Sequence, residues 1–446
     1  MFFKLKKPDL SKIENEEIIK ILEGDHALEV FDFVKKVNKS EYLFWDKVQY
    51  KEPSPKGISK EMLWKLIKMF RSSQEISPIK DKNEIYFKWS RLDYFEEFFH
   101  ELDMHTGGEL FVGSGELNKA SKQKLISRGI MEEAIASSQL EGAATSRHAA
   151  KKMLREGRKP SNKSEQMIVN NYLSMKQIED RFKDEEMSLD LIMELHSLIT
   201  KETVDSQGEK PRLRNVGEPI YVTDEIDDVI YHEGPNIEFV KKELKILIDF
   251  ANNKNKNESF IHPVLKAIMI HFWMGYLHPF TDGNGRLARL LFYWYLIKNN
   301  YWAFAYLPVS KVIKNSKKQY KMAYVYSEQD DNDMTYFLDY NMRKIRMAVE
   351  EFKTYLKHQS EKNVEMNQKS ETEYNLNMRQ VQLLQYLFGN PEERTTLGAH
   401  MNVNQIAKMT ASKDLKNLVS KGFLESQKQG RHVYYYGTSK IKILFH

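Results

Sequence analysis

The segment with the most reactive combination of side chains in this 446-residue chain runs from His278 to Arg289. It reads His-Pro-Phe-Thr-Asp-Gly-Asn-Gly-Arg-Leu-Ala-Arg, and so combines an imidazole, a carboxylate, a glycine turn and two guanidinium groups. His278 is the one side chain here whose unperturbed pKa lies near neutrality, which makes it the candidate general base for an attacking hydroxyl. Asp282 offers a hard oxygen ligand of the kind that suits magnesium carried by nucleotide phosphates.

The glycine turn in this segment is suited to binding an anion. Gly283 and Gly285 flank Asn284 and permit a tight turn whose backbone N–H groups can converge on one point. The apolar residues that follow resume helical spacing, so a helix should begin here with its positive end facing the bound group. Arg286 and Arg289 lie three residues apart on one face of that helix and can reach the same phosphate chain. The pattern therefore predicts a site for a polyphosphate and an alcohol.

A buried helix should position this turn. Apolar residues at helical intervals predict it from about Pro263 to about Leu277, and Pro279 would end it. Taken singly, the site residues could be an ordinary core histidine, a common turn and solvated arginines. Their convergence within twelve residues favours a function instead.

A zinc site is the other chemical interpretation of the histidines in this region. His262, His271 and His278 recur along the predicted helix, and the last two would share a face. The chain has no cysteine and no His-Glu-x-x-His motif, which structural and catalytic zinc sites commonly use. We therefore interpret His271 as a packed histidine.

The segment resembles the signature of the Fic family, His-x-Phe-x-[Asp/Glu]-Gly-Asn-Gly-Arg-x-x-Arg, and it matches at every defined position. The resemblance implies transfer of AMP from ATP, with Mg²⁺, to a Ser, Thr or Tyr hydroxyl of a target protein. It makes His278 the general base, Phe280 a core anchor and Asp282 the magnesium ligand. It assigns the phosphates to Gly283, Asn284, Gly285, Arg286 and Arg289. Attack would fall on the α-phosphorus, with catalysis mostly by positioning and charge neutralisation.

A second motif lies upstream, where Ser137-Ser-Gln-Leu-Glu141-Gly142 ends a helical pattern. Ser137 and Glu141 are four residues apart and would share a helix face, and Gly142 suits the helix end. The motif is similar to the inhibitory sequence [Ser/Thr]-x-x-x-Glu-[Gly/Asn] of the Fic family. That resemblance implies that Glu141 pairs with Arg289 and blocks the position of the ATP γ-phosphate. A carboxylate there would also repel a triphosphate, so we expect inhibition to be built into this chain.

Composition limits the classes of protein that the chain can represent. The absence of cysteine excludes disulfides and thiol nucleophiles and fits a reducing compartment. We find no signal-peptide pattern at the start and no apolar run approaching the ~20 residues of a membrane span. We therefore expect a soluble cytoplasmic protein without a membrane partner. The net charge of +5 is mild for this length and does not by itself indicate nucleic-acid binding.

The chain is predicted to be mainly α-helical and to contain four regions. A helical N-terminal region is expected over 1–105, and a Fic-type core with its inhibitory helix over 106–357. A linker or loop at 106–115 would open the core. A solvated helix end or linker at 358–377, poor in apolar residues, would lead to a winged helix-turn-helix domain at 378–446.

One β-hairpin is expected inside the helical core. Segments 214–223 and 229–235 carry β-branched and aromatic residues beside polar turns, which predicts two short strands, with a surface loop as the alternative. In the Fic family such a hairpin, the flap, pairs with an extended target segment and places its hydroxyl over the histidine. The resemblance implies the same strand addition here.

The C-terminal region resembles a winged helix-turn-helix. Its pattern predicts helices near 381–387, 395–401 and 404–420, and then a two-stranded wing reaching 430–436. Its basic residues outnumber Asp414 and Glu425 nearby and would suit phosphate contacts. These basic residues are Lys408, Lys413, Lys416, Lys421, Lys428 and Arg431. Winged helices also dock proteins, so we favour a protein or self-association role and keep DNA as the alternative.

Three functions remain open at this stage. The favoured one is a protein adenylyltransferase that is held inactive by Glu141. The second is a Fic hydrolase in which Glu141 orients water to remove AMP from a modified protein. The third is a DNA-binding regulator whose Fic core senses nucleotide. The sequence leaves open the target, which could be the chain itself, and also homo-oligomer formation.

Overall fold

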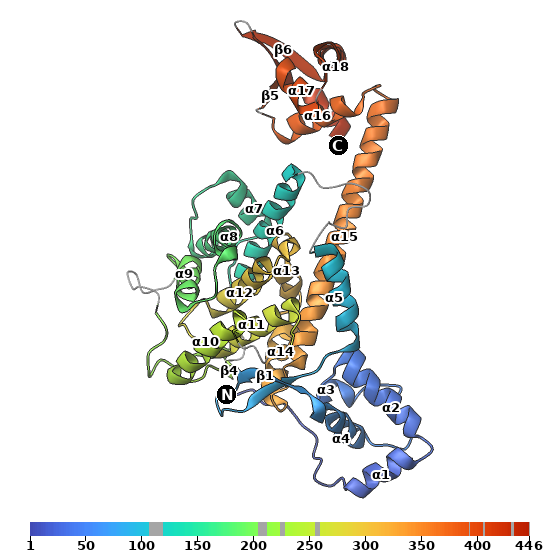
Figure 1. The fold of residues 1–446 in the computed structure, drawn as a ribbon, viewed down its shortest axis with the longest axis vertical. Coiled ribbons are helices and arrows are strands. Elements are labelled where there is room, and N and C mark those ends of the chain that lie inside the picture. The colour runs from blue at the N-terminus through green and yellow to red at the C-terminus, as the bar shows by residue number, and fades with distance from the viewer. Residues whose placement is uncertain are drawn as a thin grey trace. The chain divides into compact units, whose positions relative to one another are not determined.

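The computed structural model describes residues 1–106, 119–203, 212–223, 228–254, 259–391, 393–404, 406–429 and 432–445. In this part of the chain the fold is mainly α-helical, as predicted, with small antiparallel sheets (Figure 1). Most of the linker or loop predicted at 106–115 lies outside the described residues. The structure divides into two compact units, Met1–Glu351 and Phe352–His446.

The N-terminal region is helical, as predicted, but it also contains a hairpin that the sequence analysis missed. Asp81 explains the turn, because its carboxylate accepts hydrogen bonds from the backbone N–H groups of Asn83 (2.9 Å) and Ile85 (2.8 Å). The helices are α1 (Asn15–Glu23), α2 (Ala27–Lys35), α3 (Trp45–Val48), α4 (Lys60–Phe70) and α5 (Asp93–Thr106), and the hairpin strands are β1 (Glu75–Lys80) and β2 (Tyr86–Trp89). The predicted helical N-terminal region therefore also contains two short strands.

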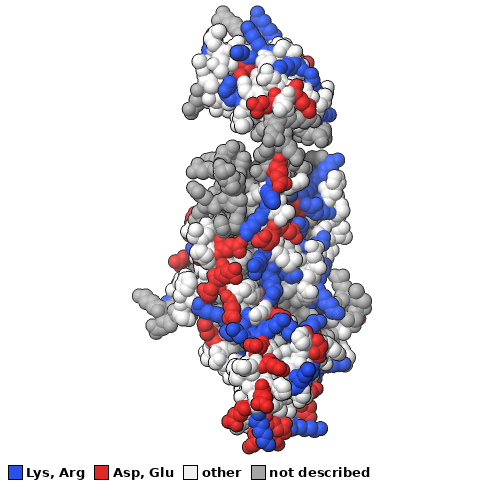
Figure 2. All heavy atoms as spheres, turned by 90° about the vertical axis from the view of Figure 1, so that its right-hand side faces the viewer, with Lys and Arg blue, Asp and Glu red and all other residues white. Residues whose placement is uncertain are grey.

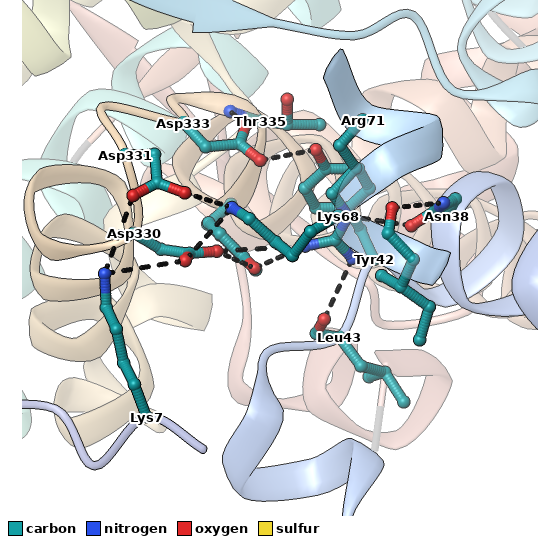
Figure 3. A network of polar contacts seen from close by, with 12 residues as sticks. Lys7, Asn38, Tyr42, Leu43, Lys68, Arg71, Asp330, Asp331, Asp333 and Thr335 are labelled. Carbon is teal, nitrogen blue, oxygen red and sulfur yellow. Dashed lines mark hydrogen bonds and ion pairs between the residues drawn. The ribbon is translucent and has the colours of Figure 1, made fainter. Parts of the chain in front are cut away.

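A buried polar network fixes these N-terminal helices to the turn between α14 (Lys317–Gln329) and α15 (Thr335–Thr372) (Figure 3). The guanidinium of Arg71 is buried and donates to Asn38 Oδ1 (2.7 Å) and the Leu43 carbonyl (2.9 Å). It also lies 4.0 Å from the ring centroid of Tyr42, whose hydroxyl donates to Asp333 (2.6 Å). The buried cation thus has both hydrogen-bond and carboxylate partners, as a buried charge requires.

Two almost wholly buried helices form the centre of the first unit. They are α11 (Pro263–Leu277) and α12 (Asn284–Lys298), whose side chains are buried around nearly the whole circumference. The bounds of α11 confirm the helix predicted from Pro263 to Leu277. The surrounding helices are α6 (Lys119–Leu140), α7 (Arg147–Glu156), α8 (Lys163–Asp180), α9 (Leu189–Thr200), α10 (Ile237–Ala251) and α13 (Val309–Lys314).

The predicted β-hairpin is present as β3 (Tyr221–Thr223) and β4 (Ile230–Glu233), which pair antiparallel. The residues that join the two strands, 224–227, lie outside the described part. The start of the chain forms a parallel β-bridge with the first residue of β4. Phe3 N–H donates to the carbonyl of Ile230 (2.8 Å), and Ile230 N–H donates to the carbonyl of Met1 (2.9 Å). The ring of Phe3 stacks on Tyr231 with centroids 4.9 Å apart.

The second unit combines helices with a three-stranded antiparallel sheet of order β5-β7-β6 among its described residues. Its elements are α16 (Met378–Gly389), β5 (Arg394–Thr396), α17 (Leu397–Asn404), α18 (Lys408–Ser420), β6 (Leu424–Gln429), β7 (His432–Gly437) and α19 (Lys442–Phe445). The short helix that we expected from Thr395 begins at Leu397, because residues 394–396 pair with β7. The segment predicted as a helix end or linker from 358 is helical to Thr372.

Candidate active site

His278 terminates α11 and presents one ring nitrogen to the site. Its backbone adopts a left-handed conformation (φ 42°), and its N–H donates to the carbonyl of Met274 (3.2 Å). Its side-chain Nδ1 contacts the carbonyl oxygen of Gly275. A carbonyl can only accept a hydrogen bond, so Nδ1 carries the proton and Nε2 keeps its lone pair. This is the tautomer that a general base acting through Nε2 requires.

The surroundings of His278 keep its imidazole neutral. Burial is the main cause that lowers its pKa to about 4, and the positive charges of His232 and Arg214 act in the same direction. The hydrogen bond to Gly275 and the charge of Glu141 act in the opposite direction. At neutral pH the ring is therefore unprotonated and able to accept a proton.

The loop between α11 and α12 is held by contacts on both sides. Phe280 is fully buried, as expected of a core anchor, and stacks on His196 of α9 with ring centroids 3.6 Å apart. The side chain of Asn284 accepts from Phe280 N–H (3.0 Å) and donates to the Phe280 carbonyl (2.8 Å). His196 Nε2 donates to the carbonyl of Asp282 (2.8 Å). Sequence analysis missed His196, which lies in an amphipathic helix without a recognisable motif.

The N-terminus of α12 offers backbone donors beside a carboxylate. Gly283 precedes the helix with φ 82°, and the N–H of Leu287 donates back to its carbonyl (2.9 Å). The N–H groups of residues 284–286 come before this first helical bond and are directed out of the helix end. Asp282 accepts from Gly283 N–H (2.6 Å), and 46% of its side chain is exposed. This is the arrangement expected of an anion site at a helix N-terminus.

The two arginines of the signature are both buried but have different partners. Arg286 donates to the carbonyl of Ile199 (2.8 Å) and lies 3.4 Å from a carboxylate oxygen of Asp282. Arg289 donates through Nε to Ser137 Oγ (2.9 Å) and through Nη2 to the Ser137 carbonyl (3.0 Å). Sequence analysis assigned both side chains to phosphates. Arg286 therefore also links α9 to the loop between α11 and α12.

The Glu141 carboxylate contacts α12 at two points, the side chain of Arg289 and the backbone at Gly285. Its Oε1 accepts from Arg289 Nη2 (2.9 Å), and a Cβ atom added at Gly285 would come within 2.2 Å of the same oxygen. Removal from water works to raise the pKa of Glu141, but the charge and hydrogen bond of Arg289 outweigh this and lower it. The positive charge of Arg286 lowers it further. The carboxylate is therefore ionised and lies against the helix end that suits an anion.

The segment that carries Glu141 is fixed to neighbouring helices. Gly142 has φ 89°, and Ala143 N–H donates to the Ser138 carbonyl (3.0 Å), which ends α6 in a compact turn. Lys314 donates to Gln139 Oε1 (2.5 Å), and Lys317 donates to the Gln139 carbonyl (3.0 Å). The position of Glu141 thus depends on contacts from α13 and α14 as well as on Arg289.

The donor set fits a magnesium ion that arrives with phosphates. Among the residues that the structure describes, no group of three or more His, Cys, Asp and Glu side chains could form a metal cage. Asp282 supplies one partly exposed carboxylate beside the anion site. Magnesium keeps most of its ligands as water and phosphate oxygens, so a single protein carboxylate is compatible with it.

Comparisons with known proteins identify a family domain in this part of the chain. Residues 186–296 match the Fic/DOC family, so the chain carries a Fic/DOC domain. A protein adenylyltransferase Fic of Nematostella vectensis is 31% identical over 109 residues, which are 24% of this chain and 22% of that protein. Protein adenylyltransferase fic-1 of Caenorhabditis elegans is 43% identical over 54 residues, which are 12% of this chain and 10% of that protein. The chain therefore spans less than a quarter of the length of these curated relatives.

A solved structure shares the fold over a larger part of the chain. The crystal structure of a Fic family protein from Desulfovibrio desulfuricans G20 covers 79% of this chain and 98% of its own, with a TM-score of 0.51. The sequence identity is 19%, so the likeness concerns the fold.

Within the described residues, no helix combines the length and apolar character needed to cross a membrane.

The basic residues predicted for phosphate contacts in the second unit are only partly available. Lys408, Lys413, Lys416 and Lys428 are exposed. Lys421 is partly buried and donates to the backbone carbonyls of Tyr374 and Asn375. Arg431 lies outside the described part.

On the face of Met1–Glu351 drawn in Figure 2, basic and acidic side chains are intermixed rather than gathered by sign.

Proposed function

We propose that this chain is a protein adenylyltransferase that transfers AMP from ATP to a hydroxyl side chain of a target protein and is held inactive by Glu141. One observation carries the proposal. The Glu141 carboxylate is bound to Arg289 at the N-terminus of α12, in the same site as the unprotonated imidazole of His278. An anion already occupies the position that suits a phosphate, and the base for the reaction stands beside it.

The proposed reaction is an in-line displacement at the α-phosphorus. The target hydroxyl oxygen attacks this phosphorus while His278 Nε2 takes the hydroxyl proton. The bond between the α-phosphorus and the bridging oxygen to the β-phosphate breaks, and pyrophosphate leaves. Asp282 would hold magnesium, which supplies charge neutralisation at the phosphates. The N–H groups that begin α12 and the guanidinium of Arg289 would stabilise negative charge on the phosphate oxygens.

Inhibition follows from competition for Arg289. A charge-assisted hydrogen bond such as that between Glu141 and Arg289 is worth about 1.5–3 kcal/mol. Its loss corresponds to about a 10- to 100-fold gain in productive nucleotide binding. The ionised carboxylate also repels a triphosphate, which adds to the effect.

The test uses α-labelled ATP with magnesium and follows labelled protein, including the chain itself. We expect Glu141→Gly to raise labelling at least about 10-fold over wild type. His278→Ala in the Glu141→Gly background should remove it. Glu23→Gly, a change at the exposed C-terminal end of α1, is the matched control and should leave labelling at the wild-type level. Equal labelling by wild type and Glu141→Gly would contradict the proposed inhibition.

The hydrolase alternative gives the opposite result for Glu141. If Glu141 orients water to remove AMP, Glu141→Gly should abolish release of AMP from a modified protein without creating transfer.

We further propose that the second unit is a winged helix-turn-helix that serves protein contacts or self-association. Size measurement of the full chain with and without residues 378–446 tests the self-association part.

A further inference from the structure

His232 on β4 is buried between three elements and has a polar partner on each ring nitrogen. Its Nε2 lies 2.8 Å from the carbonyl oxygen of Tyr276 in α11, and its Nδ1 lies 2.8 Å from Oε2 of Glu328 in α14. A carbonyl accepts only, so Nε2 carries a proton. An ionised carboxylate also accepts only, so Nδ1 carries one as well. The hydrogen-bond pattern therefore describes an imidazolium.

This imidazolium lies beside the proposed base. The ring centroids of His232 and His278 are 5.6 Å apart, and the carbonyl that His232 binds belongs to the residue two positions before His278. Gly234, at the end of β4, is so close that an added Cβ would lie 3.3 Å from the Cβ of His278. The hairpin, the end of α11 and α14 thus meet at His232.

The charged groups that act most strongly on the two rings can be named. Glu328 and Lys82 face His232, from α14 and from the β1–β2 turn. Glu141, Arg214 and His232 face His278. Burial works to lower the pKa of His232, but the charge of Glu328 and the hydrogen bonds to Glu328 and Tyr276 outweigh it and raise it.

We propose that His232 is a positioning residue for the transfer reaction: as an imidazolium bound to Glu328 and to the Tyr276 carbonyl, it fixes the hairpin against the end of α11 and keeps a positive charge beside His278. This inference rests on the proposed function of His278 as base. Two effects follow. First, the hairpin is held in one place relative to Nε2 of His278. Second, the positive charge disfavours protonation of His278 before the reaction, so the base stays available in mildly acidic solution.

The kinetic test uses the Glu141→Gly background, in which the site is open. The rate of AMP transfer is measured between pH 3.5 and 8 for this variant and for the same variant carrying His232→Gln or Glu328→Gln. Glutamine keeps a donor for the Tyr276 carbonyl but has no charge. Without Glu328, burial should leave His232 neutral. We expect the acidic limb of the profile to move to higher pH by roughly 0.5–1 unit in both, with kcat reduced and KM for ATP changed less than about 2-fold. His26→Gln, at an exposed histidine beside α2, is the control.

A second measurement does not depend on activity. The imidazole signals of His232 and His278 are titrated by NMR in the wild-type chain, with His278→Ala used to assign its signal. We expect His232 to remain protonated at pH 7, and the midpoint of His278 to rise in His232→Gln and in Glu328→Gln. Thermal unfolding of each variant checks that it is folded, and Glu328→Gln serves if His232→Gln fails to fold.

The outcomes separate the two proposals. A neutral His232 at pH 7, or an unchanged His278 midpoint together with an unchanged pH profile, would overturn the role of His232. Absence of AMP transfer in Glu141→Gly with the expected NMR titration would overturn the proposed function and leave the charge arrangement standing.

Discussion

Glu141 and Arg289 are 148 positions apart in the chain, and their side chains meet at 2.9 Å at the start of α12. The same guanidinium also donates to the side chain and the carbonyl of Ser137, one helical turn before Glu141. Arg289 is buried, whereas 33% of the Glu141 side chain is exposed. The pair is therefore a contact that can open at the carboxylate side while the arginine stays in place.

The strength of the proposed inhibition should follow the charge at position 141. Glu141→Gln keeps the length of the side chain but removes the negative charge, so it should bind Arg289 more weakly than glutamate does. We expect labelling by α-labelled ATP in the order wild type, Glu141→Gln, Glu141→Gly, with the middle variant raised roughly 3- to 10-fold. A Glu141→Gln variant as active as Glu141→Gly would mean that charge alone sets the inhibition.

Arg289 should contribute to ATP binding once Glu141 is removed. In the Glu141→Gly background, Arg289→Ala removes a charged partner of the phosphates and should raise KM for ATP about 10- to 100-fold. Arg181→Ala, at an exposed arginine that follows α8, is the control. If KM for ATP were the same with and without Arg289, its assignment as a phosphate ligand would be wrong.

Thermal unfolding should report the same competition without catalysis. A ligand that binds only the folded state raises Tm, so under the proposed function ATP with magnesium should raise the Tm of Glu141→Gly more than that of wild type at equal concentration. At a free ATP concentration about 100 times Kd the stabilisation is about 2.7 kcal/mol. Equal Tm shifts in the two proteins would show that Glu141 does not compete with the nucleotide.

His271 should make stability depend on pH. It is buried against Tyr320 (2.7 Å), as expected of a packed histidine, and burial lowers its pKa to about 3. The lowered folded-state pKa means that its contribution is present above the unfolded-state pKa near 6.5 and is lost as the pH falls below it. Between pH 6.5 and pH 5 this one group should cost about 2 kcal/mol of unfolding free energy.

Urea unfolding at pH 5 and pH 7 tests this contribution. His271→Gln should lower stability at pH 7 and reduce the difference between the two pH values by about the same 2 kcal/mol. His148→Gln, at an exposed histidine in α7, should retain the wild-type difference. An unchanged pH difference in His271→Gln would contradict the role assigned to burial.

The parallel β-bridge between the start of the chain and β4 should stabilise the hairpin. Phe3→Pro removes the N–H that donates to the Ile230 carbonyl and should speed amide hydrogen exchange in β3 and β4. Lys4→Pro is the matched control, because the N–H of the next residue in a strand points to the other side. Equal exchange in both variants would show that this pairing does not support the hairpin.

The local parts of the site could be predicted from the sequence because they depend on neighbours in the chain. Helical spacing placed α11 from Pro263 to Leu277, and Gly283 indicated the turn before α12. The spacing of Ser137 and Glu141 placed both on one side at the end of α6. These features follow from backbone geometry and side-chain periodicity, which act over a few residues.

Only the tertiary structure decided which distant groups meet. His196 supports the loop through stacking and a carbonyl hydrogen bond, Arg286 reaches Ile199, and His232 bridges two helices, yet none of these contacts has a local sequence pattern. The physical reason is that buried polar groups take whichever partners the packing of helices brings within reach. The sequence alone thus indicated the candidate residues of the site, and packing determined the partners that hold them.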